Sequence, residues 1–186
     1  AESLKIPITI FISTDPVEHG DAYWWSYVNT ANKRGVFNEN AQALKKMNNS
    51  IRKSIVNEIK LKILLAREAL TVDDINEINL SKFISIGSHT VSHPILTTCS
   101  DEEVYYELSA SKLRIEDMIC EQVNSFAYPN GAYTDREIRQ LKKIGYSVAF
   151  CTQPGVIDRT NIHNIYNLPR FEILEDASFT ENVCRM

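Results

Sequence analysis

Short apolar segments alternate with segments that carry helix-start signals, and this alternation limits the fold more than any other feature of the chain. The expected strands are residues 6–12, 83–86, 124–127 and 146–152. Capping boxes at residues 100–103 and 134–137 predict one helix over residues 101–119 and another that ends at residue 144. Strands that alternate with helices are typical of a parallel α/β architecture, which is the predicted fold class.

The other segments give weaker signals. Residues 6–12 are almost continuously apolar, which favours a strand buried on both faces, and residues 13–16 should close that strand as a polar loop. Residues 38–70 place apolar side chains at helical spacing and predict one long helix or two shorter ones. A capping pattern at residues 71–74 predicts a further short helix towards Leu80.

The composition is that of a globular domain. The 186 residues, of which 44% are hydrophobic and 24% charged, suffice for one domain with a buried core. The formal net charge of -4 gives no electrostatic reason to expect nucleic acid or an anionic membrane as a partner. No apolar run is long enough to form a membrane span.

The cysteines are scattered along the sequence. Cys99, Cys120, Cys151 and Cys184 show no Cys-x-x-Cys spacing, so a zinc ribbon or a thioredoxin-like redox site is not supported. Cys120 and Cys151 lie in or beside apolar stretches and are expected to be buried thiols. Scattered cysteines and the lack of a signal peptide in this sequence favour a reducing, cytoplasmic compartment.

Two histidines stand close together where the second apolar run ends. Gly87 permits a change of backbone direction and Pro94 prevents an ordinary helix, so His89 should lie at a strand tip and His93 one loose turn later. Neutral imidazoles are common zinc ligands, and a catalytic zinc site needs about three protein ligands. The pair is therefore a candidate metal site, although two rings that bond to loop backbone would leave the same pattern.

Polar side chains follow each of the first three predicted strands. Thr14 and Asp15 follow the first, the two histidines the second, and residues 128–131 the third. In parallel barrels the active site forms at the C-terminal ends of the strands, so these groups should lie close together.

Residues 88–96, Ser-His-Thr-Val-Ser-His-Pro-Ile-Leu, resemble the second motif of the polysaccharide deacetylases, carbohydrate esterase family four. Residues 126–131 resemble the third motif, residues 168–171 resemble the Leu-Pro-Arg segment of a bacterial subgroup, and residues 6–12 are similar to the strand that follows the first motif. The segments occur in the family's order. The resemblance implies a distorted (β/α)7 barrel, here incomplete at its N-terminus, formed by residues 1–186 as a single domain with a helical insertion at about residues 38–80.

The resemblance implies a metal-dependent hydrolase that removes N-acetyl or O-acetyl groups from a polysaccharide or glycan precursor. It implies an acetylated carbohydrate as substrate, a divalent metal, most of all zinc, as cofactor, and His89 and His93 as metal ligands. The family's first motif, Thr-Phe-Asp-Asp-Gly, carries the catalytic base and the third metal ligand. It should lie before Ala1, so we expect little or no activity from this chain.

The third motif implies further site residues. By resemblance, the backbone N–H of Asn130 helps to hold the oxyanion, and Tyr128, Pro129 and Gly131 contact the substrate. A plain Pro-Asn-Gly turn is the alternative explanation of the same residues.

Arg170 is the second implied catalytic residue. The family's third motif often begins with an Arg that orients the base, but this chain has Ala127 there, and Arg170 is expected to replace it. A buried guanidinium needs a carboxylate, so Arg170 should pair with the missing base in the intact protein. In this chain the alternatives are that it has no partner or that it pairs with Asp15 or Asp158. Asp15 is also a candidate third metal ligand, with a cap as the simpler role. By resemblance His163 is a candidate general acid, but its surroundings favour an exposed loop.

Three alternatives stay open. Tyr23, Trp24 and Trp25 could stack on sugar rings, but the expected role is to anchor the helical insertion. The chain could be a non-catalytic carbohydrate-binding or scaffold domain that keeps the histidine pair, or a metallohydrolase of a non-sugar amide. An uncovered edge beside residues 6–12 would favour a homo-oligomer.

Overall fold

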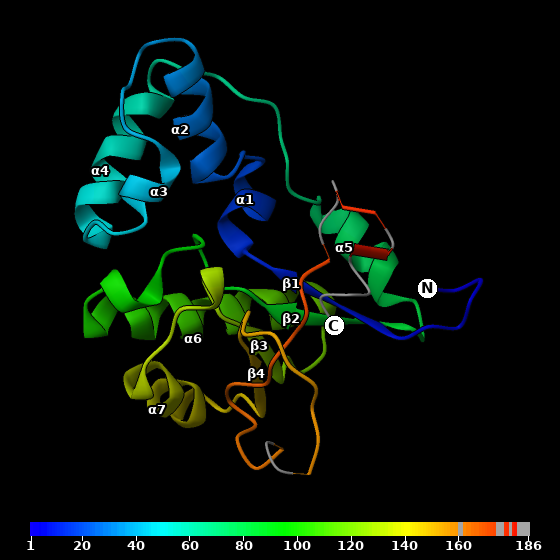
Figure 1. Ribbon diagram of the computed structural model, residues 1–186. Helices are drawn as coiled ribbons and strands as arrows, with labels where there is room; N and C mark the ends of the chain where they lie inside the picture. The colour runs from blue at the N-terminus through cyan, green and yellow to red at the C-terminus, as the bar shows by residue number, and fades with distance from the viewer. Residues whose placement is uncertain (160–161, 174–176, 179, 182–186) are drawn as a thin grey trace.

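Four parallel strands form the centre of the molecule. The computed structural model describes residues 1–159, 162–173, 177–178 and 180–181 (Figure 1). The strands are β1 (Ile8–Ile12), β2 (Ile84–Ser88), β3 (Ser125–Ala127) and β4 (Val148–Phe150). They pair in the order β1-β2-β3-β4, and Phe150 forms a further parallel bridge with Leu168. The strands thus follow one another in sequence order, as in the predicted α/β barrel.

The helices form two groups. They are α1 (Thr14–His19), α2 (Trp24–Lys33), α3 (Ala41–Leu44), α4 (Asn49–Lys60), α5 (Val72–Asn79), α6 (Asp101–Ile119) and α7 (Asp135–Ile144), with short 3-10 turns η1 (Leu96–Thr98) and η2 (Pro129–Gly131). Figure 1 shows α6 and α7 together along one side of the sheet, and α2, α3 and α4 as a separate group at the top of the view. No helix among the described residues is long and apolar enough to span a bilayer.

The main core lies between one face of the sheet and the helices α5, α6 and α7. The strand register pairs Ile10 with Ile86 and Ser88 with Phe126, which places these side chains on the same face. Ile86 and Phe126 are buried there together with Leu108 of α6. Helices that cover a parallel sheet bury the apolar side chains of its strands.

The opposite face of the sheet is concave. Phe11 of β1 and Phe150 of β4 meet edge to face with ring centroids 5.6 Å apart, although two strands separate them. A Cβ atom at Gly87 would lie 2.6 Å from the Phe11 ring, so only glycine at this position allows the ring to pack over β2. The sheet curves as a barrel does but does not close within the described residues.

A second core joins α2, α3 and α4. Tyr27 and Val28 of α2 pack with Leu44 of α3 and with Val56 and Ile59 of α4. Residues 38–70 thus contain two helices, the second of the two predicted forms. The boundaries of the insertion and the assignment of one domain stay predictions.

Three sequence expectations were wrong. Residues 6–12 are not buried on both faces, because β1 is an edge strand and Ile6 and Ile8 are exposed. Residues 13–16 do not form a loop, because α1 begins at Thr14 and a proline is tolerated in its first turn. Cys120 is exposed as the left-handed C-cap of α6, whereas Cys151 is buried as expected; Cys184 lies outside the described residues.

Candidate active site

The two histidines lie in a tight loop at the C-terminal end of β2. The backbone N–H of His89 donates to Ile12 O at 2.8 Å, which continues the sheet by one residue. Thr90 and His93 both adopt positive φ, and Thr90 Oγ1 accepts from the backbone N–H of His93 at 3.0 Å. The turn brings the two rings together, with centroids 4.6 Å apart and planes inclined by 78°.

Both imidazoles are neutral at neutral pH. Burial lowers the pKa of His89 to about 4, aided by the positive charge of Arg170 and opposed by a hydrogen bond to Ala127. Burial also lowers the pKa of His93 to about 3, together with His89 and the charges of Arg52 and Lys45. Neutral rings keep the lone pair that a metal requires, and no proton has to be displaced.

The hydrogen bonds of the two rings fit a metal site. His89 Nδ1 lies 2.6 Å from Ala127 O and, because a carbonyl only accepts, this nitrogen carries the proton and the lone pair is on Nε2. A second hydrogen bond of this kind is usual for histidine ligands, since it fixes the tautomer and the ring orientation. His93 Nδ1 is buried without a hydrogen-bond partner. These two residues could hold a divalent metal.

Among the described residues no third ligand lies beside the pair. Within residues 1–159 and the other described ranges, the carboxylate, thiol and imidazole groups that gather in threes are Asp15, Glu18 and His19, and this exposed group does not include His89 or His93. Asp15 also pairs with Arg114 at 2.9 Å. The structure therefore gives no support to Asp15 as the third ligand.

Glu107 of α6 supports the histidine loop, and no local sequence pattern indicates this role. Its carboxylate is fully buried and accepts from the backbone N–H groups of Val91 and Ser92, each at 2.9 Å. It also accepts from the Ser92 hydroxyl at 2.6 Å, and Lys53 lies 3.5 Å away. This one side chain thus accepts from three donors of the loop between the two histidines.

The Pro-Asn-Gly turn follows β3, as predicted. Asn130 is exposed with φ 56°, and no acceptor for its backbone N–H is found among the described residues. Its Oδ1 accepts from Lys45 Nζ at 2.8 Å, so the insertion reaches this turn. Gly131 has φ +68°, and a Cβ there would lie 2.0 Å from Thr152 Oγ1, which explains the glycine by packing within the chain.

Tyr128 and Pro129 lie beneath the turn. Both side chains are buried, and the Tyr128 ring stacks on Tyr133 with centroids 4.7 Å apart. The Tyr128 hydroxyl donates to Tyr166 O at 2.8 Å, and burial raises its pKa. A side chain with no exposed surface supports the turn and does not contact a ligand, so we correct the expected substrate contact of Tyr128.

Arg170 lies on the concave face of the sheet. Its Nε donates to Cys151 O at 3.0 Å, and its guanidinium lies 5.6 Å from the centroid of the Phe11 ring. It forms no ion pair with a carboxylate in the part of the chain that is described, and burial lowers its pKa. The expected pairing with Asp15 is absent, because Asp15 pairs with Arg114.

The aromatic cluster surrounds His93. Trp24 is buried and its Nε1 donates to His93 O at 3.1 Å, which is the anchoring role that was expected. Tyr23 and Trp25 are stacked at 4.6 Å and half-buried, and the Trp25 ring meets the His93 ring edge on at 4.6 Å. His163 is exposed in its loop, as expected.

Comparisons with known proteins identify the family of this chain. A sequence profile of polysaccharide deacetylases matches residues 2–149. Protein YxkH of Bacillus subtilis (strain 168), whose name places it among polysaccharide deacetylases, is 30% identical over 90 residues, which are 48% of this chain and 32% of that protein. The chitooligosaccharide deacetylase of Azorhizobium caulinodans is 33% identical over 96 residues, 50% of this chain and 43% of that enzyme. The matched regions span less than half of either curated relative.

Solved structures share the fold. The Streptococcus pyogenes deacetylase PplD, solved in complex with acetate, superposes with a TM-score of 0.56 at 18% identity and covers 97% of this chain and 96% of its own. A polysaccharide deacetylase from Bacillus cereus superposes with a TM-score of 0.57 at 17% identity, covering 97% of this chain and 68% of its own. With a profile match over most of its length and this fold, the chain belongs to the polysaccharide deacetylase family.

Proposed function

We propose that this chain carries the metal-binding part of a deacetylase that removes N-acetyl or O-acetyl groups from a polysaccharide or glycan precursor. One observation carries the proposal. Two neutral imidazoles lie in contact at the end of β2, one oriented by Ala127 O and the other with a buried nitrogen that has no partner. A family of deacetylases and a histidine pair arranged in this way together favour metal-assisted hydrolysis of an acetyl group.

Each residue of the proposed site has a distinct role. His89 and His93 hold the metal, zinc above all; when bound, such an ion polarises the acetyl carbonyl and acidifies water. The backbone N–H of Asn130, which has no acceptor among the described residues, donates to the developing oxyanion. Lys45 fixes the Asn130 side chain from the insertion, and Arg170 orients the carboxylate that acts as base.

The catalytic base is not supplied by any motif of this sequence. The sequence contains no Thr-Phe-Asp-Asp-Gly segment, and Arg170 has no carboxylate partner in the described ranges. We therefore propose that the 186-residue chain alone binds zinc weakly and turns over acetylated sugars slowly or not at all.

A zinc titration by calorimetry tests the metal site. After treatment with a chelator, we expect one zinc per chain at neutral pH, with binding lost in His93→Ala and unchanged in His163→Ala, whose imidazole is exposed. Zinc binding that survives in both His93→Ala and His89→Ala would reject the site.

An assay of acetate release tests the reaction separately. With an acetylated chitooligosaccharide as substrate, we expect no release by the zinc-loaded chain, and release once a segment with the Asp-Asp motif is restored. Rapid turnover by the chain as it stands would show that another residue serves as base.

A non-catalytic carbohydrate-binding domain is the second candidate. The exposed surface of the stacked Tyr23–Trp25 pair beside His93 favours it, because stacked aromatic side chains suit sugar rings. Binding of the chitooligosaccharide without any turnover after the motif is restored would favour this candidate.

A further inference from the structure

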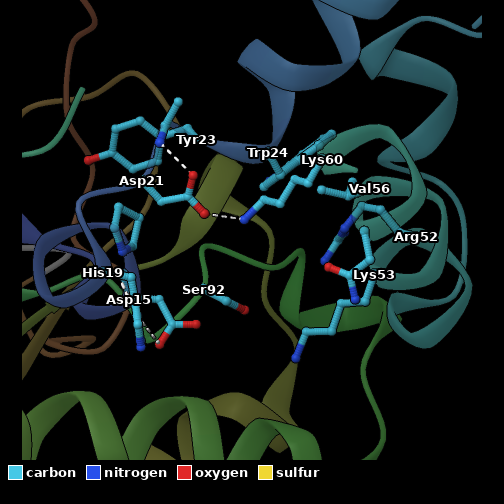
Figure 2. Close-up of a pocket in the computed structure, with 13 residues that line it drawn as sticks. Asp15, His19, Asp21, Tyr23, Trp24, Arg52, Lys53, Val56, Lys60 and Ser92 are labelled. Atoms are coloured by element: carbon cyan, nitrogen blue, oxygen red, sulfur yellow. Dashed lines mark hydrogen bonds and ion pairs between the residues drawn. The ribbon is translucent and has the colours of Figure 1, made fainter. Parts of the chain in front are cut away.

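A separate cavity lies between α1 and α4. Its volume is about 390 Å³, within the range of small-molecule sites, and neither His89 nor His93 lines it. Helices α1, α2 and α4 and the backbone turn at Ser92 form its walls. Figure 2 shows the basic side chains of α4 on one side of the cavity, and Asp15, His19 and Asp21 on the other.

Arg52 is the unusual group in this wall. The side chain is only 3% exposed, and its Nη1 atom is buried without a hydrogen-bond partner. Its Nη2 donates to the neutral Asn49 Oδ1, and its guanidinium lies 5.1 Å from the centroid of the Trp24 ring. Buried arginines normally have a carboxylate partner, because an uncompensated charge away from water is costly.

The other charges of the cavity are already compensated. Lys60 forms an ion pair with Asp21, and Asp15 pairs with Arg114 from α6 at 2.9 Å. Lys53 lies 3.5 Å from Glu107. In the part of the chain that is described, Arg52 is thus the cation of this wall that forms no ion pair, and Glu107 and Glu103 stabilise its charge without direct contact. A planar guanidinium with a free N–H edge is suited to a carboxylate or a phosphate.

The rest of the wall suits a sugar ring. Tyr23 and Trp24 provide aromatic surface, while Asn57 and Lys53 provide polar groups. Sites that combine aromatic surface with a few polar groups are typical of small polar ligands. We propose that this cavity binds a sugar residue that carries a carboxylate or a phosphate, with the anionic group at Arg52 and the ring beside Trp24. This binding does not depend on the deacetylation proposed above.

The two tryptophans of the chain make binding measurable. Trp24 and Trp25 are adjacent, and only Trp24 lines the cavity, so Trp25→Phe leaves one emitter in its wall. In this variant we expect glucuronate or glucose 6-phosphate to change the emission of Trp24 with saturation, and glucose to have no effect. A response to glucuronate alone assigns a carboxylate source, a response to glucose 6-phosphate alone a phosphate source, and a response to both the shared anion chemistry. No response to either, or an equal response to glucose, would overturn the proposal.

Substitutions of Arg52 test where the anion binds. In Arg52→Gln we expect affinity to fall at least about tenfold, the usual effect of losing one charged hydrogen bond. Arg52→Lys should keep part of the affinity, and Lys62→Gln, an exposed lysine that does not line the cavity, should keep all of it.

A second variant covers the case in which Arg52→Gln does not fold. Asn57 is an exposed residue of α4 that lines the cavity, so Asn57→Leu should fold and should weaken binding by filling the space. Circular dichroism checks the fold of each variant. Unchanged affinity in a folded Arg52→Gln, or in Asn57→Leu where Arg52→Gln is unfolded, would contradict this site.

Discussion

Glu107 is the residue on which the geometry of the histidine loop depends most. It accepts three hydrogen bonds from Val91 and Ser92 with a carboxylate that is fully buried, and the Val91 N–H is buried as well. Outer partners of this kind usually matter to a metal site almost as much as the ligands do.

Glu107→Gln is therefore expected to destabilise the chain and to weaken zinc binding. The N–H groups of Val91 and Ser92 both donate to Oε2, so the amide oxygen can keep them, but the bonds lose their charged acceptor. The Ser92 hydroxyl loses its acceptor at Oε1 and Lys53 loses a nearby negative charge, at a cost of about 1–3 kcal/mol. Zinc affinity should fall roughly tenfold. Urea unfolding and calorimetry measure the two effects, and Asp117→Asn, on the exposed side of the same helix, should change stability by no more than about 0.5 kcal/mol. Wild-type stability in Glu107→Gln would contradict the role given to this carboxylate.

The histidine pair also makes stability depend on pH. Burial holds the pKa of His89 at about 4 and of His93 at about 3, against 6.5 for an unperturbed histidine. Below pH 6.5 the unfolded chain therefore binds more protons than the folded chain, and stability falls as the pH falls. The cations Arg52, Lys45 and Arg170 face the rings and act in the same direction.

We expect the free energy of unfolding of the metal-free chain to be constant above pH 6.5 and to decrease between pH 6.5 and about 4. Urea unfolding at several pH values measures this decrease. It should be reduced in a variant with His89→Gln and His93→Gln, and should persist in His163→Gln, whose ring is exposed. A constant free energy of unfolding over this range in the wild type would show that the histidines have the same pKa in the folded and unfolded chain.

At this scale the sequence predicted the histidine pair but not the residues that support it. His89 and His93 lie close together in sequence and belong to a local motif, so the motif alone indicated them. Glu107 and Lys45 contact the same loops from α6 and from the end of α3, and such contacts across the fold leave no pattern in the local sequence. Resemblance predicted that Tyr128 contacts the substrate, and it gave no sign of the packing against Tyr133 that buries this side chain.

Among the elements, the Pro-Asn-Gly turn after β3 allows a matched comparison of two glycines. Gly131 and Gly35 both have φ +68°, but a Cβ at Gly131 would meet Thr152 at 2.0 Å, whereas nothing lies within 4 Å of a Cβ at Gly35. The backbone strain is thus the same at the two positions, and only Gly131 adds a clash.

Gly35→Ala should cost about 1–2 kcal/mol, the strain of the left-handed conformation. Gly131→Ala should cost at least about 1 kcal/mol more, because Thr152 must move away. Thr152→Ala should recover part of this difference, since it removes the nearest atom but leaves the Thr152 backbone in place. Urea unfolding of the single and double variants measures these values; equal costs at the two glycines would show that the turn yields to the added methyl group.

Elements that carry their own signals were predicted best. Ser100, Thr134 and Thr71 each form the capping box expected of them, because such hydrogen bonds are made within one turn of helix. Helix α1 was missed because its start is stabilised from elsewhere. The N–H of Thr14 donates to Thr90 O and that of Asp15 to Val91 O, so the histidine loop helps to fold it.

Considered as a whole, the molecule places its candidate site where two cores meet. The sheet core positions His89, and the helical core holds His93 through Trp24 and reaches Asn130 through Lys45. Resemblance to a family predicted the curved parallel sheet. It did not predict the path of the insertion over the site, because contacts between two cores depend on their packing and not on periodicity within either.

The outer edge of β1 gives a prediction about assembly. Ile8 N donates to Phe83 O and Ile12 O accepts from His89, so alternate residues of β1 bond to β2. Thr9 and Phe11 therefore direct their backbone groups to the other side, where the sheet has no further strand among the described residues. Ile6 and Ile8 are exposed along this edge, and an open apolar edge favours pairing with a second copy of the chain.

We expect the chain to associate as its concentration rises, and Thr9→Pro to shift it towards monomer. Proline removes the outward N–H of Thr9 and leaves the bonds between β1 and β2 in place. Thr9→Val keeps the N–H and should associate as the wild type does, which separates the hydrogen bond from the side chain. Analytical ultracentrifugation measures the populations. A wild type that stays monomeric at all concentrations would contradict association through this edge. So would a Thr9→Pro variant that associates as the wild type does, and the copies would then meet through another surface.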